Sequence, residues 1–239
     1  MGAATFLLER AYEDCLERIA MIGHRYACAL LLGCPDPAWP ERLAAHADAV
    51  AIADPGTIFA ETAGGEVVVE DEWEVPAEQF SLICAIGTLD TVNDLPRAIR
   101  GLASALEPGG LLIGAVSGGH TLPLLRRALA SADRVAGVAA AHVHPRIEAS
   151  ALAPLLANAG LERPVVDIDR VDVSYSSLDR LIDDLRRMGA TNVLTERPRA
   201  GIGKAARAAA AAEFAAAGQD GRSTETFEIL HFAAWRPAR

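Results

Sequence analysis

Short apolar stretches alternate with helix-like stretches along the first half of this chain, and this alternation restricts the fold more than any other feature. The run YACALLL at 26–32 carries no charge and ends at Gly33, which is typical of a strand buried on both faces. Because parallel strands need helical crossovers, the alternation up to about Val116 predicts a doubly wound α/β fold, with helices on both faces of a mostly parallel sheet. The expected strands are 26–32, 49–53, 66–69, 79–86, 111–116, 165–173 and 227–235, and the expected helices are 6–22, 37–46, 94–106, 121–134, 150–159, 177–188 and 204–217.

Local signals refine three of these elements. Asn93 or Asp94 is suited to cap the helix over 94–106, in which Pro96 falls within the first turn. The segment Glu-Pro-Gly-Gly at 107–110 is typical of a turn before the next strand. The run VVDIDRVDV at 165–173 alternates apolar and charged residues, which predicts an edge strand with one wet face.

Composition excludes several classes of protein. The chain has 239 residues, of which 51% are hydrophobic, yet no apolar run reaches the roughly 18 residues that a membrane span requires. Residues 1–10 lack the pattern of a secretory signal, so we expect a cytoplasmic protein without membrane insertion. A formal net charge of −10 argues against a nucleic-acid partner, because binding to phosphates depends on Lys and Arg.

Cysteine and histidine spacing gives little support for a metal site. The four cysteines form no C-x-x-C pair. The His142-Val143-His144 segment would place both rings on one face of an extended stretch, but no further ligand stands at a suitable spacing, so we predict no bound metal. Cys34 is either a loop spacer or a reactive thiol near a helix start.

The loops after the strands are where a ligand should bind, because open α/β sheets bind ligands beyond the carboxyl ends of their strands. The first loop begins at Gly33, which can let the backbone approach a ligand closely. Pro35 and Pro37 follow, and each lacks the N–H that would point at a phosphate or carboxylate. A rigid connector between strand and helix is the alternative interpretation of this loop.

Acidic residues end the second and third strands. Asp54 could accept the hydroxyls of a ribose, or it could simply form the turn with Pro55 and Gly56. The segment Glu-Asp-Glu-Trp at 70–73 could hold an adenine with a carboxylate and an aromatic ring, or it could be a solvated acidic loop. Within this sequence no nucleophile elbow, zinc-protease helix or phosphate-binding loop is present, so hydrolase and phosphate-loop chemistry have no support.

Several motifs follow one another in an order that resembles a known family. They are LDTVNDLP at 89–96, LEPGGLLIG at 106–114, GGHTL at 118–122, HVHP at 142–145, VDVSY at 171–175 and DLRRMG at 184–189. This order is similar to that of the class I S-adenosylmethionine (SAM)-dependent methyltransferases, in particular the methyltransferase-like family that includes a mitochondrial complex I assembly factor. It resembles more distantly the malonyl-carrier-protein methyltransferases of biotin synthesis.

The resemblance implies a Rossmann-like sheet of seven strands, mostly parallel with an antiparallel C-terminal strand, and SAM lying over its first four strands. It implies one domain, with a helical cap at 1–25, a cofactor half at 26–117 and an acceptor half at 118–239. The residues that would hold SAM, carried over by position, are Gly33, Cys34, Asp54, Pro55, Asp71, Glu72, Ile86, Gly87 and Thr88.

The departures from the family pattern fall in the cofactor half. Leu31 stands where the family has an acid, and Pro35 and Pro37 replace the later glycines of the cofactor loop. Ser81 and Asp90 also differ from the residues usual at their positions, which are an acid and a histidine. These changes concern SAM binding more than they concern the fold.

Two functions remain open, beside the further alternative that the pocket binds a different small ligand. The first is a methyltransferase that modifies a protein side chain or a small-molecule acceptor, with Asp90 or His120 as the base if one is used. The second is a non-catalytic binding or assembly protein with a degenerate SAM site, such as a module for respiratory complex assembly. The strand at 165–173 or the last strand also offers an edge for pairing in a homodimer.

Overall fold

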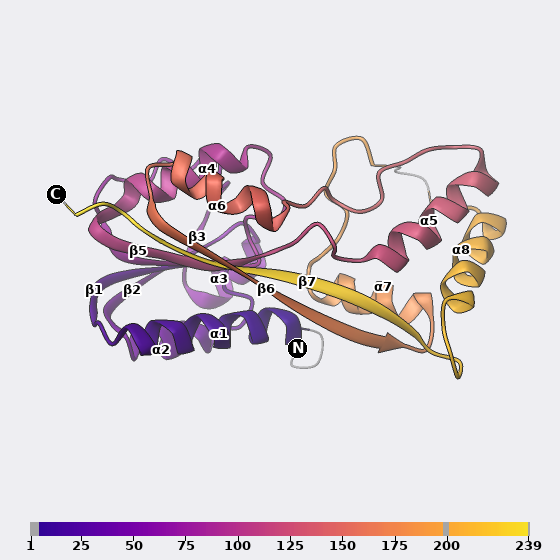
Figure 1. Ribbon diagram of the computed structural model, residues 1–239, viewed down its shortest axis with the longest axis horizontal. Coiled ribbons are helices and arrows are strands. Elements are labelled where there is room, and N and C mark those ends of the chain that lie inside the picture. The colour runs from indigo at the N-terminus through magenta and orange to yellow at the C-terminus, as the bar shows by residue number, and fades with distance from the viewer. Residues whose placement is uncertain (1–4, 198–200, 239) are drawn as a thin grey trace. The chain divides into compact units, whose positions relative to one another are not determined.

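The computed structural model describes residues 5–197 and 201–238 and contains one seven-stranded sheet in the order β3-β2-β1-β4-β5-β7-β6 (Figure 1). The strands are β1 Tyr26–Leu32, β2 Ala47–Asp54, β3 Glu66–Val67, β4 Phe80–Ile86, β5 Leu106–Ser117, β6 Glu162–Tyr175 and β7 Ser223–Trp235. The helices are α1 Phe6–Ile22, α2 Trp39–Ala44, α3 Thr57–Ala63, α4 Leu95–Ala105, α5 Pro123–Ala136, α6 Ala149–Asn158, α7 Leu178–Arg187 and α8 Lys204–Ala216.

The pairing of the strands confirms the doubly wound sheet. β1 pairs in parallel with β2 and with β4, β2 with β3, and β4 with β5. β7 is antiparallel to β5, and β6 is an edge strand, both as predicted. No helix in the described part of the chain is long and apolar enough to cross a membrane.

One local prediction was wrong, and one helix was missed. The segment at 107–110 is not a separate turn, because β5 begins at Leu106 and absorbs the segment as an irregularity in its pairing with β4. Gly109 accommodates this irregularity with a φ of +81°. The helix α3 was not predicted, because it has only seven residues, TIFAETA, and only Ala60 is buried.

Two compact units share the chain, and each is described by itself. Among the described residues, the sheet unit comprises 6–117, 147–169 and 229–238, and the helical unit comprises 118–146, 170–197 and 201–228 with Thr5. Within the sheet unit, α1 and α2 lie on one side of the strands and α4 and α6 on the other (Figure 1). This arrangement buries the central strands on both faces, which explains their continuous apolar sequence.

The core of the sheet unit forms where β1, β4 and β5 meet α4 and α6. Buried side chains from each of these elements make one cluster, which includes Leu30, Ile83, Leu102, Leu112 and Leu156. Asp94 caps α4 as predicted, because its carboxylate accepts a hydrogen bond from the backbone N–H of Arg97 at 2.9 Å.

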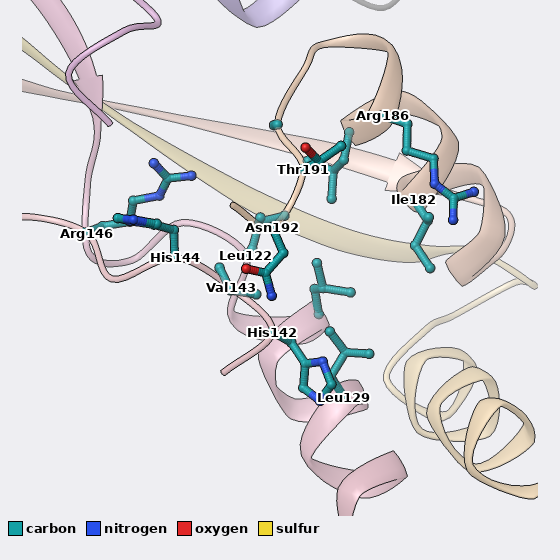
Figure 2. A pocket seen from close by; sticks show the side chains of 13 residues that line it. Leu122, Leu129, His142, Val143, His144, Arg146, Ile182, Arg186, Thr191 and Asn192 are labelled. Atoms are coloured by element: carbon teal, nitrogen blue, oxygen red, sulfur yellow. The ribbon is translucent and has the colours of Figure 1, made fainter. Parts of the chain in front are cut away.

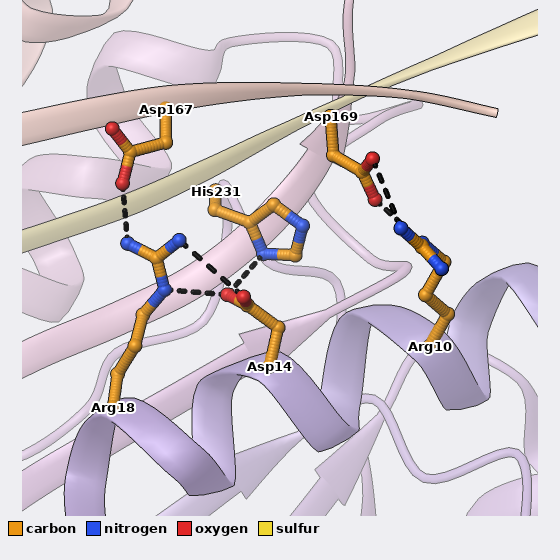
Figure 3. A network of polar contacts seen from close by, with 6 residues as sticks. All are labelled: Arg10, Asp14, Arg18, Asp167, Asp169 and His231. Atoms are coloured by element: carbon orange, nitrogen blue, oxygen red, sulfur yellow. Dashed lines mark hydrogen bonds and ion pairs between the residues drawn. The ribbon is translucent and has the colours of Figure 1, made fainter. Parts of the chain in front are cut away.

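Ion pairs hold α1 over the far strands of the sheet (Figure 3). Arg10 Nε lies 2.6 Å from Asp169 Oδ2, and Arg18 Nη1 lies 2.5 Å from Asp167 Oδ2. Asp14 of α1 contacts both Arg18 and the buried His231 of β7, whose Nδ1 is 3.0 Å from the carboxylate. Because most of these groups are partly exposed, the pairs orient the helix and add little stability each.

A matched pair of glycines tests how tightly the sheet is packed. A Cβ at Gly114 would lie 2.2 Å from the carbonyl oxygen of Ala85 and 2.8 Å from the ring of Phe232, whereas a Cβ at Gly101 of α4 would meet nothing within 4 Å. We expect Gly114→Ala to lower the free energy of unfolding by about 1–3 kcal/mol. Gly101→Ala should raise it by about 0.5–1 kcal/mol, because alanine favours helix interiors. Urea unfolding of both variants checks this, and equal effects would contradict the packing described.

Candidate functional site

The candidate site lies at the carboxyl ends of β1–β4, in the sheet unit. Gly33 ends β1 with a φ of +88°, and a Cβ there would lie 2.1 Å from the carbonyl oxygen of Ile86 and 2.3 Å from Cγ2 of Thr88. Only glycine fits at this point, because both the space and the backbone angle exclude a side chain. The predicted residues Gly33, Ile86 and Thr88 are thus brought together.

Asp54 holds the loops after β1 and β2. Its buried carboxylate accepts a hydrogen bond from Cys34 N at 2.7 Å and one from Gly56 N at 2.6 Å. Burial raises the pKa of Asp54, and these two bonds lower it. Each oxygen retains a second lone pair, so the carboxylate can still accept a hydrogen bond from a ligand hydroxyl.

The loop after β1 is filled by its own side chains. Leu31, Cys34 and Pro35 are all buried, and α2 starts at Trp39 with Pro40 in its first turn and no side-chain cap. Pro40, like Pro35 and Pro37 before it, has no backbone N–H, so the start of this helix offers one donor fewer. The loop therefore points few free amides outward, which fits the rigid connector rather than a glycine-rich cradle.

Helix α1 fixes this connector from outside. The ring of Tyr12 stacks on Trp39 with centroids 4.2 Å apart, and its hydroxyl donates to the carbonyl oxygen of Trp39 at 2.7 Å. Glu9 accepts from Trp39 Nε1 at 2.7 Å and also pairs with Arg42. Aromatic stacking and charge-assisted bonds together hold the start of α2 in one position.

Ser81, which departs from the family pattern, and Cys34 of the first loop both have structural roles. The Ser81 hydroxyl accepts a hydrogen bond from Cys28 N and donates one to Cys28 O, which joins β4 to β1. Cys34 is buried, and burial together with Asp54 raises the pKa of its thiol to about 12. A protonated thiol is a weak nucleophile, so the structure favours the loop spacer over the reactive thiol.

The acidic segment after β3 places its carboxylates differently. Glu72 is exposed, and Asp71 Oδ2 accepts a hydrogen bond from Asp94 N at 2.7 Å. Glu70 turns inward, and its Oε1 is buried with no hydrogen-bond partner among the described residues. Burial, then the charges of Asp71, Asp54 and Asp90, raise the pKa of Glu70.

Glu70 is the residue that the sequence analysis did not single out. The sequence carried no signal that separates it from Glu72, because strand alternation would turn positions 70 and 72 to the same side, and these residues lie beyond the end of β3. An unpaired buried carboxylate oxygen is costly and is commonly matched by a ligand donor. Thr88 presents a second buried oxygen, Oγ1, without a partner in the described chain.

The remaining predicted residues of the sheet unit are Gly87, Pro55 and Asp90, and each has a different environment. Gly87 has a φ of +66°, and a Cβ there would lie 2.7 Å from Cδ2 of Leu8 in α1. Pro55 is exposed in the turn after β2. Asp90 Oδ1 accepts a hydrogen bond from Ser117 N at 2.5 Å, so this candidate base helps to fix the end of β5.

In the helical unit, buried acids of β7 organise the GGHTL segment. A Cβ at Gly118 would lie 2.3 Å from Oε1 of Glu228, so the glycine leaves room for this side chain. The carboxylate of Glu228 accepts hydrogen bonds from His120 N at 3.3 Å and from Arg170 Nε at 2.9 Å. Thr121 exchanges hydrogen bonds with the backbone of Glu228. His120 itself is exposed, so its ring takes no part in this arrangement.

Glu225 caps α5 from the neighbouring strand. Leu122 precedes the helix in a left-handed conformation and offers no polar side chain. The fully buried carboxylate of Glu225 accepts hydrogen bonds from Leu124 N at 3.1 Å and Leu125 N at 2.7 Å. A carboxylate at a helix N-terminus also interacts favourably with the helix dipole.

The two rings of the His142-Val143-His144 segment make separate contacts. His142 Nε2 lies 2.8 Å from Asp133 Oδ1, and His144 Nδ1 lies 2.8 Å from the carbonyl oxygen of Pro145. Over residues 5–197 and 201–238, no group of three or more His, Cys, Asp or Glu is arranged to hold a metal ion. Both rings instead line a cavity of about 200 Å³ (Figure 2).

The family model of the methyltransferase domain matches residues 8–165. This chain belongs to the methyltransferase domain family. It is 34% identical over 178 residues to the mitochondrial arginine-hydroxylase NDUFAF5 of Danio rerio, which covers 72% of this chain and 55% of that protein. It is 35% identical over 159 residues to the malonyl-[acyl-carrier protein] O-methyltransferase of Xylella fastidiosa strain M23, which covers 66% and 51%. The chain thus spans about half the length of these relatives.

Solved structures agree on the fold of this methyltransferase-family chain. The YcgJ protein of Bacillus subtilis matches with a TM-score of 0.61 at 12% identity, over 95% of this chain and 100% of that one. The N-methyltransferase NodS of Bradyrhizobium japonicum, in complex with S-adenosyl-L-homocysteine (SAH), matches with a TM-score of 0.51 at 17% identity, over 98% of both chains. The architecture is therefore that of a SAM-dependent methyltransferase, as the motif order implied.

The buried carboxyl of Glu70 predicts a dependence of stability on pH. Its pKa is raised in the folded chain, so its favourable contribution is complete below the unfolded-state pKa, near 4.3, and is lost as the pH rises through the folded value. Because glutamine cannot ionise, Glu70→Gln should unfold at a higher urea concentration than the wild type at pH 7.5.

This advantage should shrink towards pH 4.5, where the protonated carboxyl is also neutral. The exposed Glu72 of the same loop gives the matched control, Glu72→Gln, for which we expect no such difference between the two pH values. A Glu70→Gln advantage that is constant with pH would mean that burial of the charge is not its cause.

Proposed function

We propose that this methyltransferase-family chain binds SAM at the carboxyl ends of β1–β4 and acts as a methyltransferase on a protein side chain or a small-molecule acceptor. The observation that carries the proposal is the buried, unpartnered Oε1 of Glu70 in the same unit as Asp54. These are acceptors for the hydroxyl and amine donors of a nucleoside.

The residues fit the nucleoside part of SAM better than its amino-acid part. Asp54 has free lone pairs for the ribose hydroxyls, and Glu70 and Thr88 offer polar atoms that need a partner. Asp71 and the segment at 86–88 complete the set proposed for the cofactor, whereas Glu72, which the sequence also placed in this set, is exposed and is left out of it. By contrast, the loop at 33–37 has lost amides to Pro35 and Pro37, so the methionine carboxylate has fewer donors.

The reaction requires little further chemistry from the protein. Bound SAM supplies an electrophilic methyl group, and methyl transfer depends mainly on positioning the acceptor in line and on excluding water. Asp90 and His120 remain the proposed proton acceptors where the acceptor group must lose a proton. Asp90 is the more restricted of the two, since its Oδ1 already accepts from Ser117 N.

A second function is supported by the filled loop. Leu31 is buried, and Tyr12 stacks on Trp39, so the side chains of this loop pack against the protein rather than face a ligand. Such a loop suits a non-catalytic assembly module. The family resemblance to a respiratory complex assembly factor gives this module a class of partner. The two functions make opposite predictions for cofactor binding, so one titration separates them.

Calorimetric titration with SAM and with SAH tests the proposal. We expect saturable binding of both, and Glu70→Ala should weaken it about 10- to 100-fold, because a hydrogen bond to a charged group contributes about 1.5–3 kcal/mol. Glu72→Ala is the control, and its affinity should match the wild type because the side chain is exposed. Asp54 is less suitable as a first variant, since its carboxylate also holds two loops.

The negative outcomes are distinct. No heat with either ligand at millimolar concentration would overturn SAM binding and leave the assembly module as the function. Binding that Glu70→Ala and Glu72→Ala reduce equally would retain the cofactor and refute the role of Glu70.

A further inference from the structure

The cavity of about 200 Å³ in the helical unit is lined along two helices by aliphatic side chains (Figure 2). They are Leu122, Leu125 and Leu129 from the start and first turns of α5, and Ile182 and Leu185 from α7. A water molecule occupies about 30 Å³ of liquid, so the cavity has room for roughly six or seven non-hydrogen atoms. A hydrocarbon body of this size would leave water against these side chains, which favours its binding.

The arginines that line the cavity are engaged with neighbouring groups. Arg186 Nη1 lies 3.7 Å from Asp183 Oδ1, and Arg146 has an interaction of its own. A charged ligand would lose its hydration and would have to compete with these contacts, whereas a neutral ligand would not. The surroundings of the cavity therefore favour a neutral ligand.

The polar group that gives this cavity its character is the imidazole of His142. Its Nε2 lies 2.8 Å from Asp133 Oδ1, and Ala140 N donates to Oδ2 of the same carboxylate at 3.1 Å. Burial raises the pKa of Asp133, but these two hydrogen bonds lower it further than burial raises it. The carboxylate is thus ionised at neutral pH and can only accept, so Nε2 of the neutral imidazole carries the hydrogen.

The other ring nitrogen of His142 is then an acceptor. A neutral imidazole has one N–H, so Nδ1 keeps its lone pair, and no hydrogen bond from the described residues reaches it. His144 is held in the same sense, because its Nδ1 donates to the carbonyl oxygen of Pro145 at 2.8 Å and leaves Nε2 to accept. A ligand that satisfies these histidines must therefore bring a hydrogen-bond donor.

A side-chain staple holds the wall of the cavity in place. Asn192 Nδ2 donates to the carbonyl oxygen of Ala141 at 2.8 Å, and its Oδ1 accepts from Leu194 N at 3.0 Å. The segment after α7 is thereby fixed to the segment that carries the two histidines (Figure 2). A preformed wall lowers the ordering cost of binding a small ligand.

We propose that this cavity binds a small neutral alcohol, with an apolar body of about six non-hydrogen atoms and a hydroxyl group that donates to Nδ1 of His142. The apolar body lies against Leu125 and Ile182. Asp133 acts as a positioning residue, because it decides which nitrogen of the ring accepts. Every residue involved belongs to the helical unit, so the inference does not depend on SAM binding in the sheet unit.

Cyclohexanol and cyclohexanone are the matched probes. They have the same size and both accept hydrogen bonds, but only the alcohol donates one. In a ligand-detected NMR titration of the full chain near neutral pH, cyclohexanol should bind about two- to tenfold more tightly, as expected for one net hydrogen bond. Cyclohexylammonium and cyclohexanecarboxylate should both bind more weakly than the alcohol.

Asp133→Asn tests the acceptor directly. Since Ala140 N occupies one side of the carboxylate, the asparagine oxygen should take that place and its amide should face His142. Nε2 must then accept, which moves the ring hydrogen to Nδ1. The preference for cyclohexanol over cyclohexanone should disappear, and ¹⁵N NMR of the imidazole should report the exchanged tautomer. Asp179→Asn is the control, because this exposed acid pairs with Arg207 and does not line the cavity.

Further variants assign the binding to this cavity. His142→Phe keeps a ring but removes the acceptor, so it should bind the alcohol and the ketone equally. Ile182→Trp should fill the cavity and abolish binding of both, whereas Val135→Trp, at an exposed position of α5, should not. Thermal unfolding of each variant confirms that it folds.

Three results would overturn the proposal. The first is equal affinity of the wild type for cyclohexanol and cyclohexanone. The second is a preference for the alcohol that survives in Asp133→Asn and in His142→Phe, and if the former does not fold, the latter decides alone. The third is binding that a folded Ile182→Trp leaves unchanged, which would place the alcohol elsewhere on the chain.

Discussion

At Gly33 the ends of β1 and β4 approach so closely that a single added carbon would lie 2.1 Å from the carbonyl oxygen of Ile86. The backbone must therefore turn with a positive φ, and Cys34 N is directed at the carboxylate of Asp54. This contact determines the path of the loop into α2, and the stacking of Tyr12 on Trp39 then fixes it. At the carboxyl ends of β1–β4, the loop after β1 is therefore packed against the sheet. The polar groups of the candidate site come instead from the acidic side chains that follow the neighbouring strands.

In both units, buried carboxylates fix loops and a helix start by accepting hydrogen bonds from backbone N–H groups. Asp54 joins two loops of the sheet unit, and Glu225 and Glu228 organise the segment before α5 in the helical unit. Each acid is buried, and the cost of removing its charge from water is offset by charge-assisted bonds to amides. The GGHTL segment, which carries part of the family resemblance, is explained by these contacts, because Gly118 leaves the space that Glu228 fills.

Much of the fold could be predicted from local pattern. The bounds of α1 and β1 agree with the prediction, because an amphipathic helix and an uninterrupted apolar strand are strong signals. The helix α3 was missed because it buries one small side chain, and the start of β5 was missed because Pro-Gly-Gly usually marks a turn rather than a strand irregularity. In both cases the tertiary context overrides local preference.

The site was predictable in position but not in detail. The rule that ligands bind beyond the strand ends located Gly33 and Asp54. It could not show that Glu70, rather than Glu72, turns inward, because the direction of a loop side chain depends on packing such as that of Val68. Nor could it reveal the cavity between α5 and α7, whose lining residues come from three separate stretches of sequence.

The two units differ in the sign of the charge that they gather. In the sheet unit, burial and the charges of Asp71, Asp54 and Asp90 raise the pKa of Glu70. In the helical unit, the arginines among the residues that line the cavity are Arg146 and Arg186, and no Asp or Glu lines it. An edge rich in acids attracts a sulfonium cation more strongly than the neutral thioether that remains after methyl transfer. In the function proposed above, the same acids would favour the charged donor over its product, and this preference would not require the amides that Pro35 and Pro37 remove.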